Sequence, residues 1–113
     1  MLDTTERQNK MNRNDFIGKM CVVRTYGAGV WYGILESLEG KGGVVSNAKR
    51  IHHWNGAASL SELSVRGVTN IRGETRIPCA VKQVLLTEII EVIPMTEEAV
   101  KNLDAIPEWR SAK

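Results

Sequence analysis

The sequence predicts an α+β fold, in which a small antiparallel, partly rolled β-sheet of four to five strands carries two short helices. Three observations predict it: β-rich runs separated by glycine turns over residues 19–53, a helix-capping pattern at Ser59, and an apolar run over 81–93 followed by another capping residue. A chain of 113 residues fits one domain, expected here over 15–113 after a disordered polar tail at 1–14.

The first three strands are expected to form a meander. Residues 19–26 (KMCVVRTY), 30–39 (VWYGILESLE) and 43–53 (GVVSNAKRIHH) are rich in β-branched residues. The loop 27–29 carries two glycines that can adopt positive φ, which favours a hairpin, and the glycine-rich run 39–43 predicts a second turn. Because the second strand starts with apolar residues on both faces, its first half should be buried on both sides.

A short helix is expected after the third strand. Ser59 and Glu62 have the spacing of a capping box, in which each side chain bonds a backbone N–H at the helix start, and Gly67 is a natural C-terminal cap. Residues 68–77 are polar and predict either an irregular loop or a poorly formed strand.

The last third of the chain begins with its most apolar segment. Residues 81–93 (VKQVLLTEIIEVI) predict one strand that bends or leaves the core at Glu88. Thr96 is expected to cap a second helix that Pro107 ends, and Trp109 is expected to pack back on the body or on a partner chain.

Composition excludes several classes of protein. The net charge of +2 is too small for non-specific nucleic-acid binding through the overall field. No apolar run reaches the ~20 residues needed to span a bilayer, and the polar N-terminus does not resemble a signal peptide. We therefore expect a cytoplasmic protein, with Cys21 and Cys79 as buried free thiols.

The hairpin loop offers one candidate ligand contact. Gly27-Ala28-Gly29 is glycine-rich, but a strand follows it rather than the helix that a dinucleotide-binding motif requires. Two interpretations remain: a plain hairpin turn, or a bare backbone whose N–H groups face an anion beside Thr25 and Tyr26.

The end of the third strand concentrates basic and aromatic residues. Strand alternation would place Arg50, His52 and Trp54 on one face and Lys49 and His53 on the other. The adjacent histidines then point apart, so no metal site is expected. Trp54 either packs in a core or interface, or stacks on a base while Arg50 binds phosphate.

The Ser59 helix start also has two interpretations, plain capping or an anion site at the helix N-terminus. No spacing of nucleophile and base, or of paired carboxylates, indicates catalysis, so the protein is not expected to be an enzyme.

Three segments together resemble a family of small bacteriophage and prophage proteins catalogued as a domain of unknown function. They are RTYGAGVWYGIL at 24–35, AKRIHHWNGAASLSEL at 48–63 and LLTEIIEVIPMTEEAVKNL at 85–103. The chain departs from that family's pattern at Gly27, where serine is usual, and at Lys49, where arginine is usual, which weakens any bidentate role there. The family looks similar to phage sponge proteins that sequester cyclic nucleotide signals of bacterial defence.

These observations predict non-catalytic binding of a small anionic ligand, which the resemblance implies is a nucleotide immune signal. The expected ligand-binding residues are Arg24, Thr25, Tyr26, Gly27, Ala28, Gly29, Trp31, Lys49, Arg50, Trp54 and Ser59. We expect no cofactor. A homo-oligomer is expected, because a second chain would help to close the site and three tryptophans offer interface anchors. The alternatives are a single-stranded nucleic-acid-binding module, or a structural or protein-inhibitor role.

Overall fold

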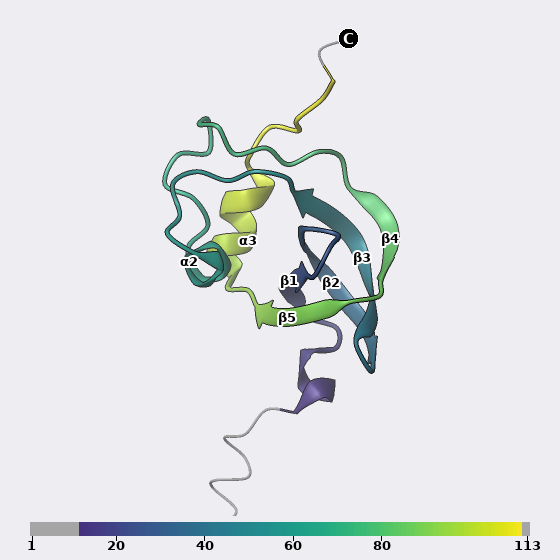
Figure 1. The fold of residues 1–113 in the computed structure, drawn as a ribbon. Coiled ribbons are helices and arrows are strands. Elements are labelled where there is room, and N and C mark those ends of the chain that lie inside the picture. Colours follow the sequence, from purple (N-terminus) through teal and green to yellow (C-terminus); the bar gives the residue numbers. More distant parts are fainter. Residues whose placement is uncertain (1–11, 112–113) are drawn as a thin grey trace, which may run out of the picture.

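The computed structural model describes residues 12–111, which form one five-stranded sheet and three helical segments (Figure 1). In chain order these are η1 (Arg13–Phe16), β1 (Met20–Thr25), β2 (Val30–Glu39), β3 (Gly42–Ile51), α2 (Leu60–Val65), β4 (Val81–Leu86), β5 (Ile89–Pro94) and α3 (Glu97–Asp104). Most of the predicted tail, residues 1–11, lies outside the described residues, and Asn12 caps the 3-10 helix η1. No helix in the described range is long and apolar enough to cross a membrane.

The sheet has the order β4-β3-β2-β1-β5, and every neighbouring pair is antiparallel. The predicted meander of the first three strands is confirmed, including the bounds of β2. Gly29 adopts a φ of 84° where the first hairpin turns back. Gly33 lets β2 and β3 approach closely, because a Cβ there would lie 2.7 Å from the Ser46 carbonyl oxygen.

The apolar run over 81–93 forms two strands, so the prediction of a single strand was wrong, whereas the predicted bend at Glu88 is confirmed. β4 pairs with β3 and β5 pairs with β1, at opposite ends of the sheet. Only two residues join them, so the sheet must curl to bring its two ends near each other, as Figure 1 shows. The Tyr26 N–H donates to Glu88 O at 2.9 Å and holds this link against the first hairpin.

Each face of the sheet carries its own apolar cluster. The helix-side cluster joins Tyr32 on β2 to Leu63 on α2 and Leu103 on α3. The inner cluster lies on the concave side of the curled sheet, which we call the roll, and contains residues from the four strands β1, β2, β3 and β4, among them Trp31 and Leu35. The prediction that β2 starts buried on both sides is therefore confirmed, since Trp31 and Tyr32 point into different clusters.

Both helices begin at their predicted caps. Ser59 Oγ accepts from the Glu62 N–H at 3.4 Å, but the Glu62 carboxylate accepts from the Ala58 N–H at 2.7 Å rather than from Ser59, so the capping box is shifted by one residue. Thr96 Oγ1 accepts from the Ala99 N–H at 3.0 Å at the start of α3. Gly67 follows α2 with a φ of 79°, as predicted for its end.

Candidate functional site

The structure divides the predicted ligand-binding residues among several locations. Thr25, Tyr26, Gly27, Ala28, Gly29, Trp31 and Arg50 lie at or beside the first hairpin, Arg24 and Lys49 are in ion pairs elsewhere, and Trp54 and Ser59 lie on the helix side of the sheet.

Within the first hairpin, polar groups satisfy one another. Thr25 Oγ1 donates to Gly29 O and accepts from the Ala28 N–H, both at 2.8 Å, and the Trp31 Nε1–H donates to Ala28 O at 3.0 Å. These bonds explain the loop as a structural turn. Tyr26 is 79% exposed and is the aromatic side chain that this hairpin presents to solvent.

Arg50 and Trp31 are cross-strand neighbours, and the Arg50 guanidinium carbon lies 4.4 Å from the centre of the Trp31 ring. Trp31 is only 6% exposed. Its ring is therefore occupied by the inner cluster and by Arg50, and it offers no open face for a base.

Arg24 and Lys49 are held by carboxylates. Arg24 Nε lies 3.0 Å from Glu91 Oε1, across the β1–β5 pair. Lys49 Nζ lies 3.1 Å from Asp104 Oδ1, which also accepts from the Tyr32 hydroxyl at 2.9 Å. The contacts of Asp104 with Lys49 and Tyr32 connect β2 and β3 to the end of α3. Lys49 thus has a structural role in this structure.

Tyr32 keeps its proton in this arrangement. Burial raises the pKa of the Tyr32 phenol well above its ordinary value, and the hydrogen bond to Asp104 and that carboxylate's negative charge raise it further. The hydroxyl is thus a hydrogen-bond donor to Asp104 at neutral pH.

The prediction that Arg50 and Trp54 share a face was wrong. β3 ends at Ile51, so strand alternation does not continue to Trp54. Trp54 is half-buried against the helix-side cluster, whereas Arg50 stacks on Trp31 of the inner cluster. Ser59 is accounted for by its cap on α2.

A groove of about 700 Å³ lies between the loop 71–76 and the segment 105–109. Arg72, Arg76 and Trp109 lie in its walls. Its size suits a nucleotide-sized molecule, since ligand pockets commonly measure ~300–1,000 Å³. We call it the Arg–Trp groove.

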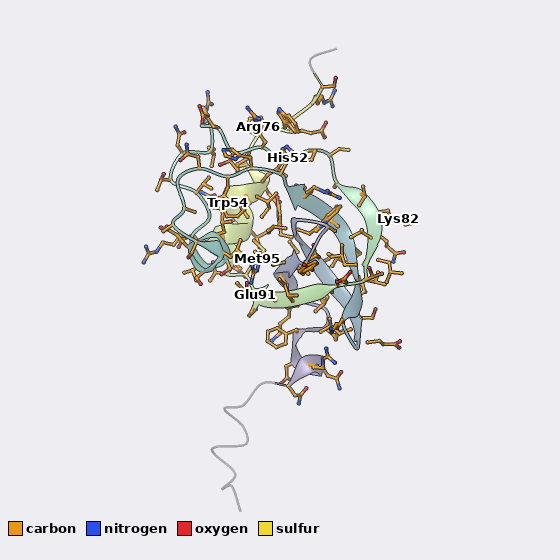
Figure 2. The ribbon with its side chains drawn as sticks, viewed as in Figure 1. His52, Trp54, Arg76, Lys82, Glu91 and Met95 are labelled. Atoms are coloured by element: carbon orange, nitrogen blue, oxygen red, sulfur yellow. The ribbon has the colours of Figure 1, made fainter. Side chains whose placement is uncertain are left out.

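Trp109 is fixed at the rim of the Arg–Trp groove by three contacts. Its ring stacks on His52 with centroids 5.0 Å apart and planes inclined by 15°, and the Arg76 guanidinium carbon lies 5.4 Å from the ring centre. The Trp109 backbone N–H donates to Ile77 O at 2.9 Å. The prediction that Trp109 packs back on the body is confirmed. Figure 2 shows the nearby positions of His52 and Arg76 at one end of the molecule.

Backbone pairing positions this arrangement. His53 and Arg76 form an antiparallel bridge, in which the Arg76 N–H donates to His53 O at 2.7 Å and the His52 N–H donates to Arg76 O at 3.0 Å. Next to it, the buried Thr75 hydroxyl donates to Asn55 O and accepts from the Asn55 N–H, both at 3.1 Å. The segment 68–77 is thus the irregular alternative of the sequence prediction, with one bridge to the end of β3.

Two cations of the Arg–Trp groove are available to a ligand. Within residues 12–111, neither Arg72 nor Arg76 lies within ion-pair distance of a carboxylate. Of the two glutamates in the walls, Glu108 binds Arg110 at 2.6 Å, whereas Glu74 is in no ion pair of the described residues, so the walls carry one unpaired negative charge beside the two arginines. No spacing in the sequence connects Arg72 and Arg76 with Trp109, because the groove joins segments some 30 residues apart.

The cysteines and histidines show no metal-binding arrangement in the described range, where no group of three or more His, Cys, Asp or Glu residues could hold an ion. Cys21 is buried, and burial raises the pKa of its thiol to about 11. Cys79 is exposed, so the prediction that both thiols are buried was wrong for Cys79.

Comparison with known proteins places this domain in a family without an assigned role. No curated protein matches the chain. A chain in the "Crystal structure of the NatC complex bound to CoA" aligns at 10% sequence identity and a TM-score of 0.47, over 84% of this chain and 97% of that one, which supports no conclusion about function. The family model described as "Domain of unknown function (DUF6948)" matches residues 18–103, and the protein therefore belongs to that family.

Proposed function

We propose that this protein binds a small, planar, anionic ligand in the Arg–Trp groove without chemically changing it. The observation that carries the proposal is the placement of Arg72 and Arg76, which have no carboxylate partner in the described chain, beside Trp109 in one groove. Guanidinium groups suit phosphate. His52 and Arg76 already contact the Trp109 ring. Trp109 is nevertheless 42% exposed, unlike the buried Trp31, so its remaining surface can contact a planar ligand.

The ligand class that we favour is a nucleotide, specifically a cyclic nucleotide signal of bacterial defence that a phage protein would sequester. The groove volume of about 700 Å³ supports a ligand of this size. Binding without turnover is supported by the groove's chemistry, since the Thr75 hydroxyl in its wall is already bonded to Asn55.

The test is a thermal-shift screen followed by calorimetric titration with mononucleotides, cyclic mononucleotides and cyclic dinucleotides. A ligand at 100-fold its dissociation constant should stabilise the fold by about 2.7 kcal/mol. Arg76→Gln and Trp109→Ala should each weaken binding at least ten-fold. Arg66→Gln is the matched control, because Arg66 is an exposed arginine at the C-terminal cap of α2 and does not line the groove.

Arg50→Gln distinguishes the Arg–Trp groove from the site that the sequence favoured. Arg50 stacks on Trp31 beside the first hairpin and does not line the groove. Binding that survives Arg50→Gln and is lost in Arg76→Gln supports the groove. The reverse result would place the ligand at the hairpin, and the absence of any shift across the panel would exclude the proposed ligand class.

Single-stranded nucleic acid is the second candidate, favoured by the same arginines and Trp109. It predicts weak binding of mononucleotides, tighter binding of oligonucleotides, and a log–log salt dependence with a slope of about −0.7 for each phosphate contacted. Saturable binding of a mononucleotide with little dependence on salt would reject it.

A further inference from the structure

The sheet has two open edges. Within residues 12–111 it ends at β4 on one side and at β5 on the other, and these strands are not hydrogen-bonded to each other. Each is six residues long. The outer side of an edge strand presents backbone N–H and C=O groups that can pair with a strand of another chain. In β5 the first and last residues do not contribute a free N–H, because the Ile89 N–H donates to Lys41 O at 2.8 Å and Pro94 has none, so pairing would use the middle of the strand.

Both edge strands also expose large aliphatic side chains. Leu85 on β4 is 67% exposed and Ile90 on β5 is 52% exposed. Isolated apolar residues on a surface are ordinary, but large apolar residues exposed on an edge strand are a candidate contact for a second strand. Lys82 on β4 and Pro94 on β5 restrict which partner strand can pair there. By contrast, the three tryptophans that the sequence suggested as interface anchors have contacts within the chain: Trp31 is buried, Trp54 packs against the helix-side cluster and Trp109 stacks on His52.

The charges of the two edges are opposite. Lys82 is the one charged residue of β4, and Glu91 is the one charged residue of β5. Pairing β4 with a second β4 would bring two lysines together, and pairing β5 with a second β5 would bring two glutamates together. Pairing β4 with β5 brings opposite charges together. Glu91 already binds Arg24, but through Oε1, so Oε2 remains for a second cation.

We propose that copies of this chain associate by pairing β4 of one copy with β5 of the next. Ile90 is the extra residue of a register irregularity in the β1–β5 pair, so the regular part of β5 begins at Glu91. Antiparallel pairing that sets Ile93 opposite Lys82 and Glu91 opposite Val84 places Lys82 diagonally across from Glu91 and brings Leu85 beside the exposed Ile90. Such a head-to-tail contact uses different surfaces on each copy, so it produces a ring if the rotation closes and a filament if it does not.

The two edges lie apart from the Arg–Trp groove, so this proposal does not depend on the proposed function. Figure 2 shows Lys82 on β4 and Glu91 on β5 at separate places on the rim of the roll, away from His52 and Arg76. Association and ligand binding can therefore be tested separately.

Sedimentation velocity over a range of concentrations tests the proposal on the full chain, whose monomer mass is 12.6 kDa. The unmodified protein should sediment as an assembly larger than a monomer. Leu85→Lys and Ile90→Lys should each be monomeric, since each removes one edge. The matched control is Val65→Lys, which changes an exposed aliphatic residue of α2 and should leave the assembly intact.

Mixing the two edge variants gives the decisive result. Leu85→Lys retains a usable β5 and Ile90→Lys retains a usable β4, so a 1:1 mixture should form dimers that grow no further. Assembly by either variant alone would indicate like-edge pairing and overturn the proposal. A monomeric unmodified protein would overturn it as well.

A pair of charge variants keeps the test valid if an edge variant fails to fold. Lys82→Glu alters an exposed side chain, and it should weaken association at least ten-fold. Combining it with Glu91→Lys should restore association, because the charges are exchanged. Circular dichroism confirms folding, and unchanged association in Lys82→Glu counts against the proposed register.

Discussion

Asp104→Ala should destabilise the fold by about 1–2 kcal/mol, because one carboxylate oxygen serves two partners. Asp104 Oδ1 accepts from the Tyr32 hydroxyl at 2.9 Å and pairs with Lys49 at 3.1 Å. Tyr32 is only 1% exposed, and leaving a buried hydroxyl without its acceptor costs about 1–3 kcal/mol. Both charged partners are partly exposed, so the ion pair adds at most about 1 kcal/mol.

Two effects place the expected loss in the lower part of that range. Asp104 is exposed, so water can replace part of its hydrogen bonding to Tyr32. It is also the last residue of α3, where a negative charge interacts unfavourably with the helix dipole. Removing the charge should therefore return about 0.3–1 kcal/mol of stability. Tyr32→Phe removes the donor as well as the bond and should cost less, about 1 kcal/mol.

Urea unfolding measures this difference, read from the midpoint at constant slope. The double variant Tyr32→Phe/Asp104→Ala should cost less than the sum of the single variants by about 1 kcal/mol, because the two residues share one bond. Glu74→Ala is the control, since Glu74 is exposed and in no ion pair of the described chain. Additive costs, or an Asp104→Ala protein as stable as the control, would refute the reasoning.

Two further predictions concern buried positions. Burial raises the pKa of the Cys21 thiol from 9.0 to about 11, so the unfolded chain loses this proton at a lower pH than the folded chain, and the free energy of unfolding should fall as pH rises from about 9 through 11. In Cys21→Ala this fall, measured by urea unfolding at each pH, should be smaller. An identical fall in the variant would contradict the assignment to Cys21. Gly33→Ala should cost about 1–3 kcal/mol, since its Cβ would meet Ser46 O at 2.7 Å. Gly27→Ala, where a Cβ meets nothing within 4 Å, should be nearly neutral, and thermal melts that failed to separate the two variants would argue against the close approach of β2 and β3.

Local signals predicted most of the secondary structure. Glycine turns and β-branched runs located the first three strands, and Ser59 and Thr96 located both helix starts, because these preferences act over a few neighbouring residues. The run 81–93 was misread because an apolar segment pairs with whichever strand tertiary structure brings to it, and here its two halves pair with β3 and β1. Apart from the charged residue Glu88, no feature of that run indicates where the first strand ends and the second begins.

The candidate site was less predictable than the fold. Strand alternation predicts a shared face for Arg50 and Trp54, but β3 ends at Ile51, three residues before Trp54, and only an isolated bridge at His53 follows it, so the shared face does not exist. Arg24 and Lys49 looked available in the sequence, but each meets a carboxylate more than 50 residues away. Charge pairing over such separations has no sequence signature, because any of several acidic residues could have been the partner.

The sequence by itself determined that this chain forms an α+β domain with a glycine-turned meander and two capped helices, since these follow from backbone preferences and from the alternation of apolar residues. Only the tertiary structure decided which basic and aromatic residues meet. It engaged Arg50 with Trp31, paired Lys49 with Asp104, and brought Arg76 and Trp109 together in one groove. The physical reason is that the curl of the sheet and the return of the C-terminal segment set these contacts, and both depend on packing between segments distant in the chain.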